Sequence, residues 1–283
     1  MQDVNLFLDA KGNWITKHQL IDIMCELGAE QCDTLFIHTA LNFGTPNPGL
    51  RKSELLHELL ECFKALGVYN LLMPTFTFSF CNHQFYDARI SASRMGVLNE
   101  FFRKQEGVIR SVDPLMSVAM LGRDTNLVRK IGHYSCGANS TYDNLRHADN
   151  VKFLMFGPRI GECLTYMHYL EWLYSVDYRY DRPFIGDVID ENGRHHEEYM
   201  LFSRYNGVTP NAGSFEFENR MYKNGLAKRI ECGNAGISIV IAENAAVEYK
   251  KCLDENPYFF VDIEGGKLIK DKTFIVTEEV VAM

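Results

Sequence analysis

The sequence has no closely spaced pair of cysteines. Its eight cysteines lie singly along the chain, without the Cys-x-x-Cys spacing that is typical of zinc sites and dithiol redox centres. Isolated cysteines of this kind are typical of reduced thiols in a cytoplasmic protein. We therefore expect no metal site.

Long apolar runs and an excess of positive charge are also missing. No stretch approaches the ~18 to 20 apolar residues that a membrane helix needs, and the first residues lack the basic start and apolar run of a signal peptide. The formal net charge is -8, whereas nucleic-acid binding needs clustered Lys and Arg. We expect a cytoplasmic protein that binds a small molecule, with no membrane and no nucleic acid as partner. Assembly into a homo-oligomer is left open.

Apolar residues at two different spacings alternate along the chain. Helical spacing predicts helices, and short continuous apolar runs predict strands that are buried on both faces. The predicted helices are 16–28 with Thr16 as its cap, a helix capped by Ser53, 97–105, 163–176 and 245–253, and the predicted strands are 34–38, 69–73, 116–121, 151–156, 237–241 and 274–276. This order indicates an α/β fold with a mixed central sheet flanked by helices. We predict one domain over residues 1–283, with a polar insertion at about 183–225 that contains a short hairpin near Asn192 and Gly193.

Thr165, His168 and Glu171 recur at every third residue of the predicted helix 163–176. This spacing places hydroxyl, imidazole and carboxylate on one helix face, within an arc of roughly 120°. A neutral imidazole is suited to take a proton from an amine, and a carboxylate beside it fixes its tautomer. An ordinary surface pair of His and Glu has the same spacing, so this pattern alone does not decide between the two interpretations.

Cys163 offers a rival interpretation as a thiol nucleophile assisted by His168. Five residues along a helix correspond to a separation of about 140°, so the two side chains point to different faces. We expect Cys163 to be a packing residue.

Two other segments could contact a ligand. His38, Thr39, Ala40 and Leu41 stand at the end of a predicted strand, where the loops of α/β folds usually bind ligands. Residues 110–117 place Arg110, Ser111 and Ser117 around a proline turn. They could hold a coenzyme, or they could tie down the loop through a pair between Arg110 and Asp113.

These pieces occur in one order along the chain. They are residues 35–41 with Gly44, 71–76, 94–96, Arg110-Ser111 with Pro114 and Ser117, 137–140, 154–157, Thr165-x-x-His168-x-x-Glu171 and 233–235. Together they resemble the aminoglycoside 3-N-acetyltransferase family, a fold distinct from the GNAT acetyltransferases. The resemblance implies direct transfer from acetyl-coenzyme A, without a metal, by His168 as general base with Glu171 and Thr165 beside it. It also implies coenzyme contacts at His38, Thr39, Ala40, Leu41, Thr75, Arg110, Ser111 and Ser117.

The resemblance implies an amino sugar of the aminoglycoside type as acceptor. We expect Phe76, Asp187 and Glu216 to contact it, because carboxylates and aromatic rings suit a cationic sugar. The aromatic residues of the insertion suit a nucleotide base equally well. A nucleotide-linked amino sugar used in surface polysaccharide synthesis is therefore an alternative acceptor. A binding protein without catalysis is a further alternative, which the presence of both His168 and Glu171 disfavours.

Overall fold

A computed structural model of the chain describes residues 3–273. Seven strands from most of its length form the largest sheet, in the spatial order β13-β14-β9-β3-β5-β8-β7. Their bounds are β3 (Thr34–Thr39), β5 (Asn70–Pro74), β7 (Ile109–Arg110), β8 (Val118–Gly122), β9 (Val151–Gly157), β13 (Ala227–Cys232) and β14 (Ala235–Ile241). The central strands β9, β3 and β5 are parallel, and the outer neighbours are antiparallel. The sheet is mixed, as predicted.

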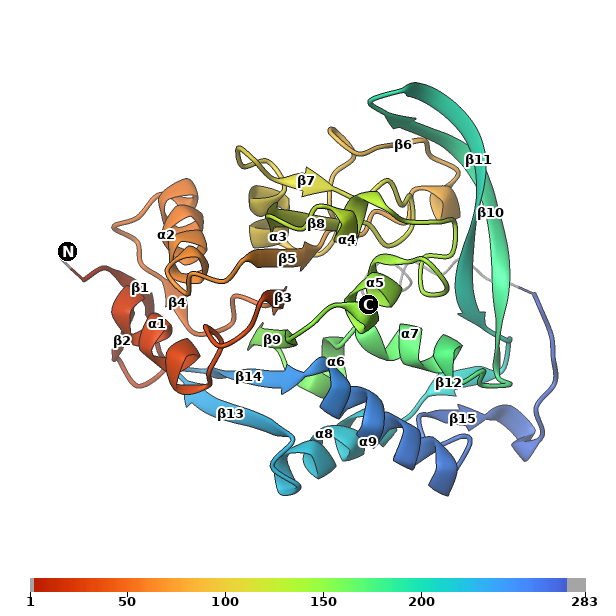
Figure 1. Ribbon diagram of the computed structural model, residues 1–283. Helices are drawn as coiled ribbons and strands as arrows, with labels where there is room; N and C mark the ends of the chain where they lie inside the picture. The colour runs from red at the N-terminus through yellow and green to blue at the C-terminus, as the bar shows by residue number, and fades with distance from the viewer. Residues whose placement is uncertain (1–2, 274–283) are drawn as a thin grey trace.

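Helices cover both faces of this sheet (Figure 1). One face packs against α1 (Lys17–Glu26), α2 (Lys52–Lys64) and α3 (Val97–Phe102). The other face packs against α5 (Thr141–His147), α7 (Tyr166–Leu173), α8 (Gly213–Lys223) and α9 (Ala242–Glu255). Successive residues of a strand point to opposite faces, so Leu35 and Ile37 lie in the first core while Phe36 lies in the second. This double covering explains the continuous apolar runs of the sequence.

Shorter elements connect and extend these layers. They are β1 (Asn5–Leu8), β2 (Trp14–Thr16), β4 (Thr45–Pro46), η1 (Phe80–Asn82), β6 (Tyr86–Asp87), α4 (Asn126–Arg129), α6 (Ile160–Cys163), β12 (Val208–Pro210), β15 (Val261–Ile263) and η2 (Glu264–Gly266). Strands β10 (Arg179–Asp190) and β11 (Gly193–Arg204) form a long twisted hairpin, seen at the right of Figure 1. Five residues, 174–178, separate the end of α7 from the start of the hairpin, so the first residues of the hairpin can reach the side chains of that helix.

Several predicted elements are confirmed. Thr16 caps α1, since its hydroxyl accepts a hydrogen bond from the Gln19 amide at 3.2 Å. Strands β3, β5, β8, β9 and β14 and helices α2, α3 and α9 lie where the apolar spacing predicted them, within a few residues. The hairpin turn near Asn192 and Gly193 is also present, although each of its strands has 12 residues and is longer than predicted.

Other predictions need correction. The single helix predicted over 163–176 is two short helices, α6 and α7, separated by Leu164 and Thr165. Helix α2 is capped at Arg51 and not at Ser53, because the Glu54 carboxylate accepts a hydrogen bond from the Arg51 amide at 2.8 Å. Helix α8 and strand β13 were not predicted at all. The strand predicted at 274–276 lies outside the described residues.

Candidate active site

The Thr-x-x-His-x-x-Glu segment brings two of its three side chains together on α7. The Nδ1 atom of His168 lies 3.2 Å from Oε2 of Glu171, one helical turn further along. The Glu171 side chain is 5% exposed and that of His168 is 36% exposed. The carboxylate is therefore inside the protein, while the imidazole reaches the surface.

Glu171 is held by three donors. Besides the imidazole, its Oε1 accepts a hydrogen bond from the Tyr178 hydroxyl at 3.0 Å, and its Oε2 lies 2.9 Å from a guanidinium nitrogen of Arg179. Burial alone would raise the carboxyl pKa, but the charge of Arg179 and the bond to His168 outweigh it and lower the pKa to about 2. An ionised carboxylate can only accept, so the 3.2 Å contact assigns the proton to Nδ1 of His168; a guanidinium nitrogen of Arg179, at the longer distance of 3.4 Å from Nδ1, makes no hydrogen bond to the ring in this tautomer.

This tautomer leaves Nε2 of His168 as an unprotonated nitrogen. Nε2 makes no hydrogen bond to any residue between 3 and 273. Enclosure of the ring by protein lowers the imidazole pKa, and the hydrogen bond to Glu171 acts in the opposite direction. The ring is therefore neutral at neutral pH and able to accept a proton at Nε2.

Thr165 lies elsewhere in the hydrogen-bond network than predicted. It is the residue before α7, and its hydroxyl lies 2.9 Å from Nε2 of His38 and accepts a bond from the Tyr142 hydroxyl at 2.9 Å. His38 is 3% exposed, and burial lowers the pKa of its imidazole to about 3, so it stays neutral. Thr165 thus joins α7 to the end of β3, and no bond connects its hydroxyl to His168 among the described residues.

The end of β3 is partly exposed at Thr39, Ala40 and Leu41. The Thr39 hydroxyl donates to Asn99 at 2.6 Å, and the Ala40 amide donates to the carbonyl of Phe156 at 2.9 Å. The Ala40 amide is consequently not available to hold a phosphate or thioester oxygen.

Arg110 is enclosed by acceptors from the protein itself. Its Nε lies 3.1 Å from the Thr75 hydroxyl and 3.2 Å from that of Ser117, and its terminal nitrogens bond the carbonyls of Thr75 and Ser91. Thr75, Ser111 and Ser117 have no exposed surface. This cluster supports the ends of β5 and β8 from within.

The pair predicted between Arg110 and Asp113 is absent from this part of the chain. The Asp113 carboxylate accepts from the amides of Leu115 and Met116, at 2.8 and 3.0 Å, and from the Ser135 hydroxyl at 2.9 Å. Burial raises the pKa of its carboxyl. The loop is tied down, as one of the two interpretations required, but by different bonds.

The structure does not group the three predicted acceptor contacts. Phe76 is 2% exposed and lies in the core. Asp187, on β10, pairs with His196 at 2.8 Å and with Arg194. Glu216, on α8, lies 3.3 Å from Arg220. Figure 1 shows β10 at the right of the molecule and α8 along its lower edge.

Cys163 ends α6, and no hydrogen bond joins its thiol to the imidazole among the described residues. Its sulfur lies 3.6 Å from that of Met155 and 3.7 Å from the carbonyl of Arg159. Burial raises the pKa of its thiol well above the ordinary value, which suppresses the thiolate that a nucleophile requires. A packing role fits these contacts.

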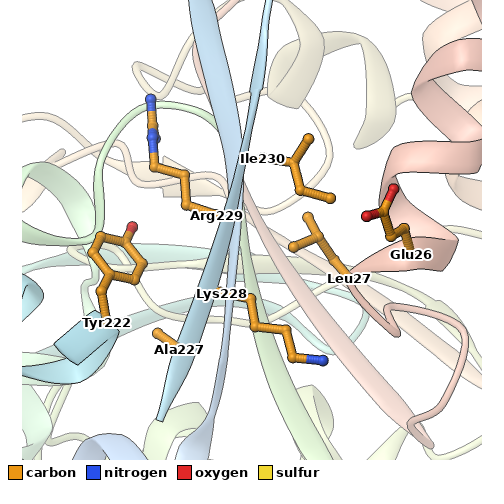
Figure 2. A pocket seen from close by; sticks show the side chains of 7 residues that line it. All are labelled: Glu26, Leu27, Tyr222, Ala227, Lys228, Arg229 and Ile230. Atoms are coloured by element: carbon orange, nitrogen blue, oxygen red, sulfur yellow. The ribbon is translucent and has the colours of Figure 1, made fainter. Parts of the chain in front are cut away.

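Two surface hollows have linings that do not include His168. One of about 440 Å³ is lined by residues of α1 and β13 with Tyr222 (Figure 2), and another of about 370 Å³ lies beside β12 and η2. Neither includes a residue predicted for the site. Within residues 3–273 no group of His, Cys, Asp and Glu is arranged to hold a metal ion, and no helix is long and apolar enough to cross a membrane.

Three side chains around Glu171 were missed from the sequence. Tyr178 and Arg179 begin the hairpin, and Arg204 ends it directly opposite Arg179. Arg204 is half-buried, and burial followed by the charge of Arg179 lowers its pKa to about 10. No spacing rule connects these positions, since only the hairpin register brings residue 204 beside residue 179.

Comparison with known proteins identifies a matching family and several similar structures. The sequence profile of the family described as aminoglycoside 3-N-acetyltransferase matches residues 52–254, more than two thirds of the chain. No curated protein matches the sequence. Among solved structures, the aminoglycoside acetyltransferase AAC(3)-Xa aligns with a TM-score of 0.71 at 18% identity, over 85% of this chain and 93% of that one.

Two further structures contain ligands according to their titles. AAC-IIIb, described as a binary complex with CoASH, has a TM-score of 0.70 at 18% identity over 84% of this chain and 96% of its own. AAC-VIa, described as sisomicin-bound, has a TM-score of 0.70 at 18% identity over 84% and 97%. At these identities the alignments show a common fold.

Proposed function

Because this chain belongs to the aminoglycoside 3-N-acetyltransferase family, we propose that it transfers the acetyl group of acetyl-coenzyme A to the amine of an amino sugar. The observation that supports this activity most directly is the partly exposed imidazole of His168, held at Nδ1 by the buried carboxylate of Glu171. This pair is a general base with a fixed tautomer.

The proton follows a simple path in this proposal. His168 takes a proton from the acceptor amine at Nε2, the amine nitrogen forms a bond to the thioester carbon, and the carbon–sulfur bond breaks. The proton then passes from Nε2 to the departing thiolate. Glu171 stabilises the imidazolium that exists between these events, and Arg179 and Tyr178 keep Glu171 ionised and in place. No acyl-enzyme is needed, in keeping with the raised pKa of the Cys163 thiol.

Coenzyme binding is proposed at the end of β3. Thr39, Ala40 and Leu41 are partly exposed there, and Thr165 connects His38 of this strand to the helix that carries His168. The buried set of Thr75, Arg110, Ser111 and Ser117 would shape this edge of the sheet from beneath it. The binary complex of AAC-IIIb with CoASH supports a coenzyme site on this fold.

The acceptor is proposed to be an amino sugar, with an aminoglycoside as the first candidate. The family description and the sisomicin bound to AAC-VIa support it. A nucleotide-linked amino sugar is the second candidate, and the observation in its favour is the pair of arginines, Arg179 and Arg204, beside the imidazole. We propose Asp187 and Glu216 only as outlying contacts, because ion pairs with the protein already engage both.

Release of free coenzyme-A thiol from acetyl-coenzyme A tests this function. Purified protein is offered a panel of aminoglycosides and nucleotide-linked amino sugars, and each product is checked by mass for one added acetyl group. The account predicts acceptor-dependent release with at least one of the two classes. If the protein binds acetyl-coenzyme A but releases no free thiol with any amine of the panel, the proposed activity is contradicted. That result would favour a binding protein without catalysis.

A further inference from the structure

Arg204 has no acidic partner among the described residues. It is half-buried at the end of β11, and no hydrogen bond or ion pair joins its guanidinium to any residue in the described part of the chain. It lies close enough to His168 to disfavour the imidazolium and close enough to Glu171 to feel its charge. A guanidinium carries five donors, so an enclosed one without an acceptor is expensive unless a ligand supplies the acceptor.

The nearby carboxylate cannot fill this role. Glu171 already accepts from Tyr178, His168 and Arg179. The Nε atom of Arg179 is itself buried and makes no hydrogen bond to any residue between 3 and 273. Asp181, the next carboxyl group on the same face of the hairpin, interacts with the Trp172 side chain. Two guanidinium groups therefore lie near one ionised carboxylate and a neutral imidazole. The carboxylate neutralises one of the two positive charges, and the other is not neutralised.

We propose that Arg204 binds an acidic group of the acceptor, a phosphate or carboxylate close to the amine that His168 deprotonates. This inference rests on the proposed acetyl transfer and narrows its substrate class. A polycationic acceptor would be repelled by the surplus positive charge, whereas an amino sugar with an acidic substituent would neutralise it. The protein as a whole is acidic, with a net charge of -8, so the positive charge at this point is local.

The phosphates of the coenzyme are poor candidates for this anion. The thioester must lie next to the amine, and hence next to His168, for the reaction to occur. The pantetheine arm then places the coenzyme's pyrophosphate and ribose phosphate at its other end, far from the base. An anion beside His168 consequently belongs to the acceptor, or to an acyl group that itself bears a carboxylate.

Two variants isolate the guanidinium. Arg204→Gln removes the charge, and Arg204→Lys keeps the charge but loses the planar donor pair. Arg129→Gln is the matched control, because it removes one arginine charge from an exposed position on α4 whose contact is Glu191 at 3.4 Å. Circular dichroism establishes whether each variant is folded. If Arg204→Gln does not fold, Arg204→Lys is compared with the wild type in its place.

Binding is measured by titration calorimetry with the full chain, using amino sugars offered free, as the 1-phosphate and linked to a nucleoside diphosphate. We expect Arg204→Gln to weaken binding of the phosphorylated forms by about 10- to 100-fold, and to leave binding of the free, cationic amino sugars equal to the wild type or tighter. Arg204→Lys should lose less affinity for the phosphorylated forms than Arg204→Gln, and Arg129→Gln should bind them as tightly as the wild type does. This result supports the anion site even if no acetyl transfer occurs, so it separates the inference from the proposed function.

Three results would overturn the proposal. One is equal binding of a phosphorylated sugar by wild type and Arg204→Gln. The second is that the wild type binds none of the phosphorylated sugars. The third is a preference for succinyl-coenzyme A over acetyl-coenzyme A that disappears in Arg204→Gln, because the anion would then belong to the acyl group.

Discussion

At the scale of single residues, Glu171 performs two tasks with its two oxygens. One oxygen accepts from His168 and Arg179, and the other accepts from Tyr178. The carboxylate fixes the tautomer of the imidazole and also neutralises a buried arginine. Removing its charge should therefore change both the acid–base behaviour of His168 and the stability of the fold.

The first prediction concerns the pH dependence of Glu171→Gln. A general base must be neutral, so the rate falls as pH drops through the pKa of His168. The carboxylate raises that pKa and Arg179 lowers it. Loss of the carboxylate should move the acidic limb of kcat/KM to lower pH and reduce the plateau by about 10²-fold, because tautomer control is lost.

The measurement is kcat/KM between about pH 5 and 8, the range in which histidine usually titrates. Tyr178→Phe serves as the comparison, since it removes one bond to Glu171 and keeps the charge. It should leave the acidic limb close to that of the wild type, because the carboxylate beside His168 stays charged. Superimposable profiles for wild type and Glu171→Gln would mean that Glu171 has no influence on the base.

The second prediction concerns stability. The pKa of Glu171 is lowered to about 2 in the folded state, so its stabilisation is present above the ordinary carboxyl pKa of about 4.5 and is lost as pH falls toward 2. Glu171→Gln should lower the free energy of unfolding at neutral pH by about 3 kcal/mol, because Arg179 becomes a buried charge without its carboxylate counter-ion. Urea titrations at neutral and acidic pH should show the deficit shrinking as pH falls. A deficit that is constant with pH would contradict this linkage.

The spacing of the sequence identified His168 and Glu171 because one helical turn brings them together whatever surrounds them. Thr165 was assigned to the same face only because the helix was expected to be continuous. The break before α7 instead turns its hydroxyl to His38. Arg179 and Arg204 could not be found this way, since they meet across a hairpin register that the sequence does not display.

At the scale of elements, the end of β9 holds the end of β3 in place. Gly157 has a φ of +105°, and a Cβ added there would lie 1.9 Å from the carbonyl oxygen of Ala40. A side chain at this position would push the proposed coenzyme-binding segment away from the sheet.

The third prediction follows from this contact. Gly157→Ala should lower the free energy of unfolding by more than about 3 kcal/mol and raise the KM for acetyl-coenzyme A, because both strain and collision act at this position. The control is Gly67→Ala, whose φ is also positive, at +69°, but whose added Cβ would meet nothing within 4 Å. That variant should cost about 1 kcal/mol and leave KM unchanged. Equal losses measured by thermal unfolding would show that the collision is relieved without consequence.

How well each helix or strand could be predicted from the sequence depended on how much of it is buried. Strands of the large sheet are covered on both faces, so their apolar runs are continuous and easy to identify. Helix α8 buries only Phe217, Glu218 and Met221, and its polar composition made it resemble part of a polar insertion. The hairpin β10–β11 alternates weakly in burial, which made its 12-residue strands resemble a polar loop.

At the scale of the whole molecule, the site lies where the helical layer and the hairpin meet. Helix α7 packs on the face of the sheet that contains Phe36 and His38, and the hairpin that follows it adds Tyr178, Arg179 and Arg204 (Figure 1). The common fold with AAC(3)-Xa at 18% identity shows that this framework persists while most side chains differ. Acceptor preference is thus expected to differ within the family, and the hairpin is the element that we expect to set it here.

The most direct test of the account compares wild type with His168→Ala in the thiol-release assay, with acetyl-coenzyme A binding measured in parallel. His57→Ala, a change to an exposed histidine on α2, is the matched control. The account predicts that His168→Ala lowers turnover by roughly 10² to 10⁴ while its affinity for acetyl-coenzyme A and its folding stay close to wild type. Turnover equal to wild type in a folded His168→Ala protein would contradict the assignment of His168 as the general base.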